Sequence, residues 1–241
     1  MSGKSFNKTA KDLSPVLFEP PKKGERVIYN VKREAHDAKD GDILKKLKIR
    51  YDETTIYPVL IGRELPKTFG HYHPQNYSGV YYPEIYSVLE GRAWYLMQKP
   101  EESNPKVIQE IYLVEAKKNE KIVLPPGFGN TTISPDKNKL KMANFVASVF
   151  ENEYHAYENL RGAAYYLFES KSGDSADFEK NSYYESVPEI VKLKPKVIPQ
   201  LGIDFKTPLY EMIRNPANLK FLTKPEKYLQ FLTIENCFEK I

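Results

Sequence analysis

Short runs of strand-forming residues, separated by turn-forming residues, dominate the middle of this 241-residue chain and constrain its fold more than any other feature. β-Branched and aromatic residues fill these runs, while Gly, Pro, Asn and Asp stand between them. At least six such strands within about 100 residues indicate a β-sandwich or a β-barrel. The expected strands cover residues 54–60, 85–97, 111–116, 121–124, 131–134 and 142–150, with a further strand over 163–168 and a surface loop over 170–181.

The rest of the chain is expected to decorate a single core. Residues 1–50 are rich in lysine and contain prolines, which is typical of an arm that packs on a larger unit. Residues 51–170 contain the expected strands and are predicted to form the barrel. Residues 171–241 are a C-terminal extension, in which apolar residues near helical spacing over 209–214 and 216–232 predict short helices.

Composition excludes several broad classes of protein. The apolar content of 41%, with 18 tyrosines and 12 phenylalanines, indicates a folded chain instead of a disordered one. The net charge of +4 comes from 36 basic and 32 acidic residues that are scattered along the chain, so no nucleic-acid-binding surface is expected. A mildly basic surface favours a phosphorylated substrate through long-range attraction.

Two features bear on the compartment. Cys237 is the sole cysteine, so no intrachain disulfide can form and a cytoplasmic location is expected. Residues 1–12 are mostly polar and lack the apolar segment of a signal peptide, and no run of 18 apolar residues occurs. The chain is therefore expected neither to be secreted by this route nor to span a membrane.

A candidate metal site begins at His71 and His73. Two histidines at positions i and i+2 of an extended segment point to the same face, because side chains alternate with a period of two. Glu84 then supplies an oxygen ligand from a neighbouring strand. Two imidazoles and one carboxylate suit a divalent iron, manganese, nickel or zinc ion that keeps open positions for a substrate.

These residues are followed by Leu89-Glu90-Gly91 and later by Pro125-Pro126-Gly127 before a β-run, and the combination resembles the cupin superfamily. More narrowly, the chain is similar to the cupin-type glucose-6-phosphate isomerases of archaea and some bacteria. The resemblance covers residues 50–168 by motif. It implies an all-β fold, the double-stranded β-helix or jelly-roll barrel, with an N-terminal arm and short C-terminal helices. It also implies a homodimer, since cupins commonly pair through strands at their edges.

In that family the second cupin motif supplies a third histidine three positions after the glycine of Pro-x-Gly. In this chain the motif glycine is Gly127, and the third position after it is Asn130. An amide oxygen can coordinate a hard cation but is a weaker donor than imidazole toward transition metals. The resemblance therefore implies a metal held by His71, His73 and Glu84, with Asn130 as a weak or lost ligand.

The resemblance further implies a sugar-phosphate substrate and a set of residues around it. Hydroxyl and backbone N–H groups in the family bind the sugar phosphate, and such neutral donors hold a dianion when they converge. A later loop also reaches the substrate in relatives. The residues of this chain at those positions are Thr54, Thr55, Thr68, Gly70, Tyr86, His155 and Tyr157.

The activity that the resemblance implies is the metal-dependent interconversion of glucose 6-phosphate and fructose 6-phosphate, a step of glycolysis and gluconeogenesis. The metal would act as a Lewis acid toward a cis-enediolate, and Glu84 is the expected proton-shuttling base. Hydride transfer is the competing mechanism. Two other functions stay open: a cupin that binds a sugar phosphate after losing catalysis, and a cupin that acts on another small molecule.

Overall fold

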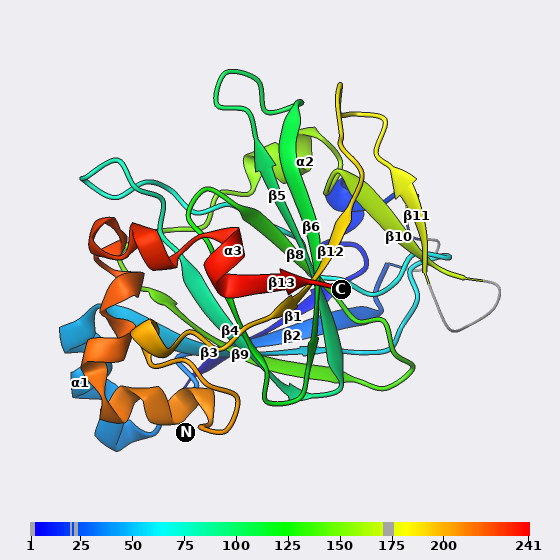
Figure 1. Cartoon of the computed structure of the whole chain (residues 1–241). Helices are drawn as coiled ribbons and strands as arrows, with labels where there is room; N and C mark the ends of the chain where they lie inside the picture. Colours follow the sequence, from blue (N-terminus) through cyan, green and yellow to red (C-terminus); the bar gives the residue numbers. More distant parts are fainter. Residues whose placement is uncertain (1–2, 20, 22–23, 171–175) are drawn as a thin grey trace.

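The computed structural model describes residues 3–19, 21, 24–170 and 176–241, and two β-sheets form its centre (Figure 1). The larger sheet has six strands in the order β1-β2-β3-β9-β4-β7, and the second has five in the order β13-β12-β6-β5-β8. Buried side chains of both sheets meet in one hydrophobic core. The strands are β1 (Lys4–Thr9), β2 (Val27–Arg33), β3 (Ile49–Ile56), β4 (Glu84–Glu90), β5 (Arg92–Pro100), β6 (Ile108–Lys117), β7 (Lys121–Leu124), β8 (Gly129–Ile133), β9 (Leu140–Ala147), β10 (Tyr165–Glu169), β11 (Ala176–Lys180), β12 (Val191–Pro195) and β13 (Phe238–Lys240).

The path of the chain between the sheets confirms the predicted cupin jelly-roll. After β4 the chain crosses to β5 and β6 in the second sheet, and β7 returns to pair with β4. Strand β8 then crosses again to pair with β5, and β9 returns to lie between β3 and β4. The two sheets share no strand among the described residues, so they face each other without closing into one continuous barrel.

The strand boundaries follow from local chemistry. The run expected over 85–97 divides at Gly91, whose φ of +82° and close approach to the Lys139 carbonyl oxygen suit a residue without a side chain. The strand expected over 54–60 is β3, which begins five residues earlier, at Ile49, and ends before Pro58, a residue that cannot donate to a ladder. Strand β7 has the predicted limits, residues 121–124.

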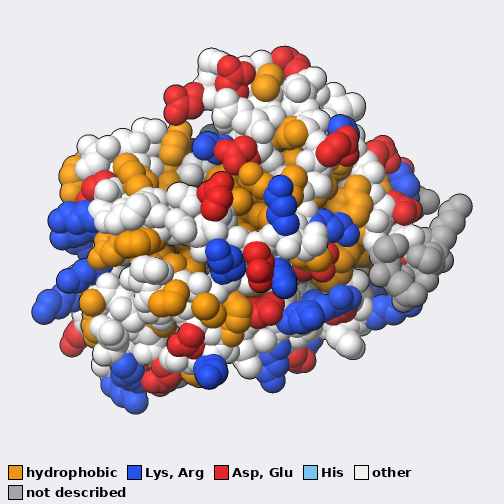
Figure 2. Space-filling view, in the orientation of Figure 1, with side chains coloured by type: hydrophobic (Ala, Val, Ile, Leu, Met, Phe, Trp, Pro, Cys, Tyr) orange, Lys and Arg blue, Asp and Glu red, His pale blue; other side chains and the backbone are white. Residues whose placement is uncertain are grey.

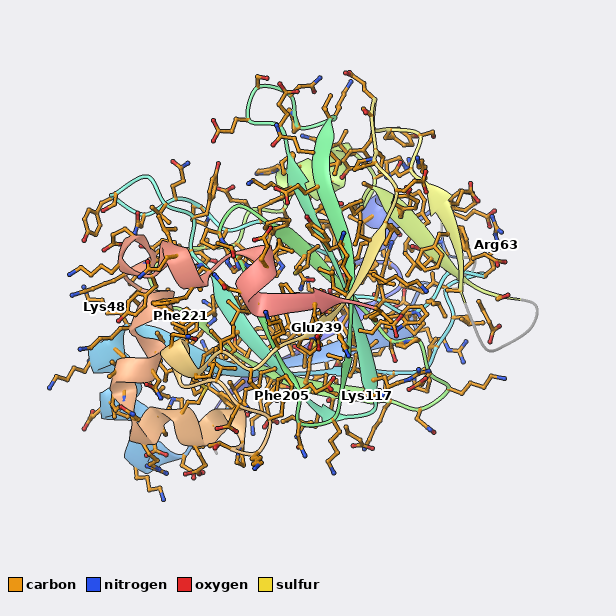
Figure 3. The ribbon with its side chains drawn as sticks, viewed as in Figure 1. Lys48, Arg63, Lys117, Phe205, Phe221 and Glu239 are labelled. Carbon is orange, nitrogen blue, oxygen red and sulfur yellow. The ribbon has the colours of Figure 1, made fainter. Side chains whose placement is uncertain are left out.

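The prediction of a surface loop over 170–181 is wrong for the second part of that range. Ala176–Lys180 forms β11, which pairs antiparallel with β10, whereas residues 171–175 lie outside the described part of the chain. Arg63 supports this hairpin, because its guanidinium lies 3.8 Å from the centre of the Phe168 ring and pairs with Glu179 at 3.1 Å (Figure 3).

The N-terminal residues extend the larger sheet. Strand β2 pairs antiparallel with both β1 and β3, so β1 and β2 continue the sheet outward. Between β1 and β2, the side chains of Leu13, Val16 and Leu17 are fully buried. Removal of these apolar side chains from water is what holds the segment against the core.

The predicted short C-terminal helices are confirmed, and most of them are 3-10 helices. They lie beside α1, at the left of Figure 1, where the orange and red segments meet the blue helix. Prolines at the start of η5 and η6 suit these short helices, since the first N–H of a helix has no partner within it. The helices are η1 (Ser14–Val16), η2 (Ala38–Asp40), α1 (Gly41–Leu47), α2 (His155–Asn159), η3 (Pro199–Leu201), η4 (Leu209–Arg214), η5 (Pro216–Leu222), η6 (Pro225–Lys227), η7 (Leu229–Phe231) and α3 (Ile234–Cys237), where η marks a 3-10 helix.

The length of the helices and the charge of the surface bear on two possible properties, a membrane span and a strongly charged face. Within the described ranges, every helix is too short or too polar to cross a lipid bilayer. On the face shown in Figure 2, lysine and arginine side chains are interspersed with aspartate and glutamate. No single sign of charge dominates that face.

Candidate functional site

A cavity of about 100 Å³ lies between the two sheets, with residues of both in its wall. Strands β2, β3, β4 and β9 of the larger sheet contribute side chains, and β8 contributes from the second sheet. The extended segment that carries the two histidines crosses the same cavity. Its lining residues are Tyr29, Val31, Arg33, Arg50, Asp52, Thr54, Thr68, Phe69, Gly70, His71, Glu84, Tyr86, Asn130, Thr132, Met142, Asn144, Asn152 and Tyr154.

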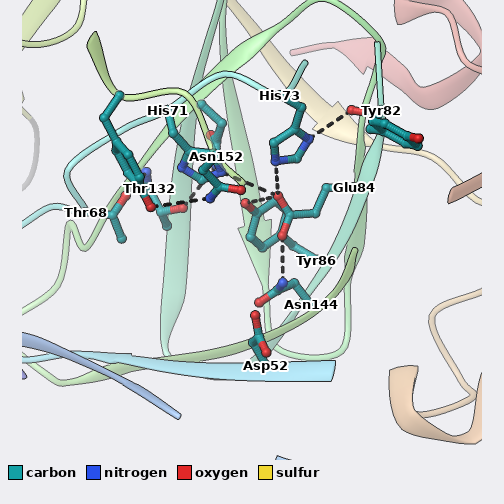
Figure 4. Close-up of polar contacts among 12 residues, drawn as sticks. Asp52, Thr68, His71, His73, Tyr82, Glu84, Tyr86, Thr132, Asn144 and Asn152 are labelled. Carbon is teal, nitrogen blue, oxygen red and sulfur yellow. Dashed lines mark hydrogen bonds and ion pairs between the residues drawn. The ribbon is translucent and has the colours of Figure 1, made fainter. Parts of the chain in front are cut away.

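The two histidines lie on an extended segment outside the named strands, with their ring centres 5.1 Å apart. Backbone hydrogen bonds in both directions, at 3.2 and 3.0 Å, pair His71 with Asn130 of β8. The Nε2 atoms of His71 and His73 lie 3.8 and 3.3 Å from Oε2 of Glu84. One carboxylate oxygen therefore faces both imidazoles, as Figure 4 shows.

The orientation of His73 is set by its own loop. Nδ1 of His73 lies 2.9 Å from the carbonyl oxygen of Tyr82, which can only accept, so Nε2 is the ring nitrogen left to face the cavity. The ring of Phe150 packs on His73 at 4.8 Å and stacks on Tyr82 at 4.7 Å. A backbone carbonyl that orients a histidine in this way is the usual support of a metal ligand.

Glu84 is the first residue of β4, and two neighbours hold its carboxylate (Figure 4). The Tyr86 hydroxyl donates to Oε2 at 2.6 Å, and the Asn144 amide donates to Oε1 at 2.6 Å. Burial opposes ionisation, but the neighbouring imidazoles of His71 and His73 outweigh it and hold the pKa of Glu84 well below its usual value. Burial also lowers the pKa of His71, which favours the neutral imidazole that can bind a metal.

The residues present fit a metal ion. One ligand atom each from His71, His73 and Glu84 lies within 4.8 Å of the others, which allows all three to bind a single ion. Nε2 of both histidines and Oδ1 of Asn130 are buried and have no hydrogen-bond partner among the described residues. Unpaired buried lone pairs are costly, and a cation between them would satisfy them.

Four of the expected substrate-binding residues line the cavity: Thr54, Thr68, Gly70 and Tyr86. The Thr68 hydroxyl oxygen accepts from the Thr132 N–H at 3.0 Å, so its own proton stays available to a ligand. Gly70 has a φ of +87°, and a Cβ there would lie 2.5 Å from the Tyr157 ring. Glycine is the residue that this crowded position requires.

The other three expected substrate-binding residues lie outside the cavity lining. Thr55 follows Thr54 on β3, and neighbouring strand residues face opposite sides of the sheet. The His155 side chain is 93% exposed and lies 3.4 Å from Glu158. Tyr157 is fully buried behind Gly70, where its ring contacts Tyr72. For His155 and Tyr157, the sequence alone does not distinguish these positions from the ones that reach the cavity.

The cavity also contains charged residues that the sequence reading missed. Arg50 and Asp52 lie on β3 with Thr54, and all three point to the cavity because they alternate along the strand. The strand predicted from sequence begins at residue 54, which leaves the first two outside it. A polar residue at every second position of 50–54 is the signal that reveals them. Arg33 of β2 and Asn144 of β9 carry no comparable signal.

Comparison with known proteins gives several similarities. Residues 7–184 match the family model described as glucose-6-phosphate isomerase (GPI). A glucose-6-phosphate isomerase of Thermococcus litoralis is 29% identical over 111 residues, which cover 46% of this chain and 50% of that protein. The one of Pyrococcus abyssi is 31% identical over 80 residues, covering 33% of this chain and 37% of that protein. The matched region thus spans half or less of these relatives.

A solved structure of oxalate oxidase is 16% identical, with a TM-score of 0.36, and the alignment covers 49% of this chain and 50% of that one. So low a score carries no conclusion. The family match is of a different kind, because it extends over well more than half of the 241 residues and includes the histidines, Glu84 and Asn130. The chain belongs to the glucose-6-phosphate isomerase (GPI) family.

Proposed function

We propose that this protein is a metal-dependent aldose-ketose isomerase that interconverts glucose 6-phosphate and fructose 6-phosphate. One observation carries the proposal: the unpaired Nε2 atoms of His71 and His73 face a buried, ionised Glu84 at the wall of a cavity. Family membership and relatives named glucose-6-phosphate isomerase support the substrate and the reaction.

The metal would be held by His71, His73 and Glu84, with the Asn130 amide oxygen as a fourth, weaker donor. Divalent iron, manganese, nickel and zinc all suit this donor set. When bound, such an ion acts as a Lewis acid that stabilises negative charge on the sugar oxygens.

Glu84 is proposed to move the proton between C1 and C2 through a cis-enediolate. Its low pKa keeps it ionised at neutral pH, so it can accept a proton. Tyr86 and Asn144 fix the two carboxylate oxygens, and this limits the rotation that would carry the base away from the substrate. Burial, with donation to Glu84, raises the pKa of Tyr86 well above its usual value, so the phenol stays a donor.

The substrate would lie against Thr54, Thr68, Gly70 and Tyr86. Thr54 and Thr68 offer hydroxyl groups, and the absence of a side chain at Gly70 leaves its backbone accessible to a ligand. Thr55, His155 and Tyr157 are not part of this proposal, because they lie outside the cavity.

A coupled assay tests the proposal. Protein stripped of metal is supplied with Fe(II), Mn(II), Ni(II) or Zn(II), and conversion of fructose 6-phosphate to glucose 6-phosphate is followed. Metal-dependent turnover is expected, and Glu84→Gln is expected to abolish it. Glu90→Gln, at the exposed end of the same strand, is the matched control and should keep full turnover.

Asn130 favours a second candidate function, a cupin that binds a sugar phosphate without catalysis. A neutral amide in place of an imidazole weakens the hold on a transition metal. Binding of the sugar phosphate with no turnover under any of the four metals would support this function and contradict the isomerase. Oxygen consumption, or activity on unphosphorylated compounds, would instead indicate other cupin chemistry.

A further inference from the structure

Two arginine side chains line the cavity and have no part in the proposed chemistry. Arg33 lies at the end of β2 and Arg50 near the start of β3, and these strands are antiparallel neighbours. Both side chains reach the same cavity as Thr68 and Glu84. The cavity therefore combines a candidate cation site with two guanidinium groups.

Arg50 is held in place on one side only. Its side chain is 15% exposed, and Nε donates to Oδ2 of Asp52 at 2.8 Å. The other oxygen of Asp52 accepts from the Glu34 N–H at 3.0 Å, so the carboxylate is itself fixed. Within the described ranges, the two terminal nitrogens of Arg50 have no hydrogen bond or ion pair. A guanidinium has five N–H donors, and four of them remain for a ligand.

The ion pair also keeps the Arg50 group charged. Burial disfavours the cation, but the neighbouring Asp52 outweighs burial and raises the pKa of Arg50 above its usual value. Asp52 contacts only Nε of this mostly buried group, so the two terminal nitrogens keep N–H donors that no described residue uses. Its unused donors are thus a preformed receptor for a planar or tetrahedral anion.

Arg33 lies where the cavity opens outward. A second chamber of about 490 Å³ shares Tyr29, Val31, Arg33, Phe69 and Tyr154 with the cavity and also includes Lys8 of β1 and Glu158. The side chain of Arg33 forms no hydrogen bond or ion pair within the described part of the chain. The inner cavity, at about 100 Å³, is smaller than the roughly 300–1,000 Å³ of common ligand pockets, so a ligand of ordinary size extends past Arg33.

We infer that Arg33 and Arg50 together bind the phosphate group of a sugar phosphate and select it over a neutral sugar. Arg50 is the fixed member, since Asp52 orients it, and Arg33 is the member at the opening. Guanidinium groups bind phosphate oxygens through two parallel hydrogen bonds. These bonds carry charge and are stronger than the hydrogen bonds that the neutral hydroxyl groups of Thr54 and Thr68 can donate. The inference rests on the proposed function for the identity of the sugar.

Calorimetric binding of sorbitol 6-phosphate tests the inference without turnover, because this hexitol ester has no carbonyl group to isomerise. The wild-type chain is expected to bind it far more tightly than sorbitol. Arg33→Gln and Arg50→Lys should each weaken binding of the ester by roughly tenfold to a hundredfold, the worth of a charged hydrogen bond, and leave sorbitol binding unchanged. Arg26→Gln, an exposed arginine that does not line the cavity, should bind as wild type.

Three results would overturn the inference: no preference of the wild type for the ester, unchanged affinity in both variants, or tighter binding of inorganic phosphate than of the ester. Arg33 has no partner to lose, so its variant reports on binding even if Arg50→Lys is destabilised. Ester binding that depends on both arginines, in a protein without isomerase turnover, would contradict the proposed function and support the inference. Isomerase turnover by the wild type, together with unaltered ester affinity in the variants, would support the proposed function and contradict the inference.

Discussion

Asn130 is the weakest donor of the proposed metal site, so a change there tests the site at the residue scale. Its backbone pairs with His71, and its buried amide oxygen has no partner among the described residues. Asn130→His would add an imidazole beside His71 and is expected to raise affinity for Zn(II) or Ni(II) by at least about tenfold. Competition with a chromophoric chelator measures this. Asn138→His adds an exposed histidine elsewhere and should change nothing; equal affinities of the two variants would contradict the proposed fourth donor.

The lone thiol offers a pH test at the same scale. Burial raises the pKa of Cys237 from 9.0 to about 12, so the folded chain at pH 8 has roughly a thousandfold less thiolate than an ordinary cysteine. Iodoacetamide should label the native protein very slowly at pH 8, and the rate should keep rising toward pH 12. The urea-unfolded chain should react at the rate of a free thiol. Fast native labelling at pH 8 would show that the side chain is accessible.

Site residues differ in how well sequence alone reveals them. His71 and His73 stand two positions apart in a recognisable motif, and Glu84 follows eleven residues later, so sequence finds all three together. Thr55 and His155 match the family pattern yet lie outside the cavity, because a side chain's direction depends on strand register and on loop packing. Strand register and loop packing depend on contacts with segments far away in the chain, which the local sequence does not show.

At the scale of elements, a small polar cluster joins the C-terminal helix η4 to the segment just before α1. The Tyr210 hydroxyl of η4 donates to Asp40 at 2.8 Å and accepts from the Asp37 N–H at 2.8 Å. Tyr210→Phe should destabilise the fold by about 1–2 kcal/mol, because the Asp37 N–H and one oxygen of the buried Asp40 carboxylate lose a partner, while Arg214 keeps the other oxygen. Urea unfolding measures the change. Tyr77→Phe, where the side chain is 88% exposed, should have no effect, and equal stabilities would remove the cluster from this role.

The spacing of apolar residues does not predict which type of helix forms at the C-terminal end of the chain. Apolar residues near helical spacing over 209–232 predict helices, and helices form there. Over three to seven residues, however, a period of 3.0 cannot be distinguished from one of 3.6, so the apolar pattern does not reveal that η4 to η7 are 3-10 helices. Strand β7 was predictable at both ends, whereas β3 begins earlier than its β-branched core suggests.

At the scale of the whole molecule, metal binding should raise the free energy of unfolding. An ion that binds only the folded chain stabilises it by about 2.7 kcal/mol at one hundred times its dissociation constant, which raises Tm by several degrees for a domain of this size. Chelator-treated protein should show this rise when Zn(II) is returned. His73→Ala should lose it, whereas His155→Ala, an exposed histidine outside the cavity, should keep it. A metal-induced rise in His73→Ala would mean that the ion binds elsewhere.

Assembly is a second property of the whole molecule. Strand β1 is the exposed edge of the larger sheet, with Phe6 45% exposed, and an uncovered edge is a template for pairing with another strand. We expect a homodimer with twice the 27.9 kDa mass of the chain, measured by light scattering after gel filtration. Phe6→Lys should weaken it, whereas Val149→Lys, at another exposed apolar residue, should not. A wild-type mass of 27.9 kDa would contradict the expectation.

The sequence by itself determined the all-β class, most strand positions and the two histidines with Glu84, because periodicity and short-range motifs are local properties of a chain. Only the tertiary structure decided which polar residues share the cavity. Arg33, Arg50 and Asn144 come from three strands of the larger sheet, and pairing of segments far apart in the chain brings them together. Strand register and sheet packing are set by burial of the whole core, which no single segment encodes.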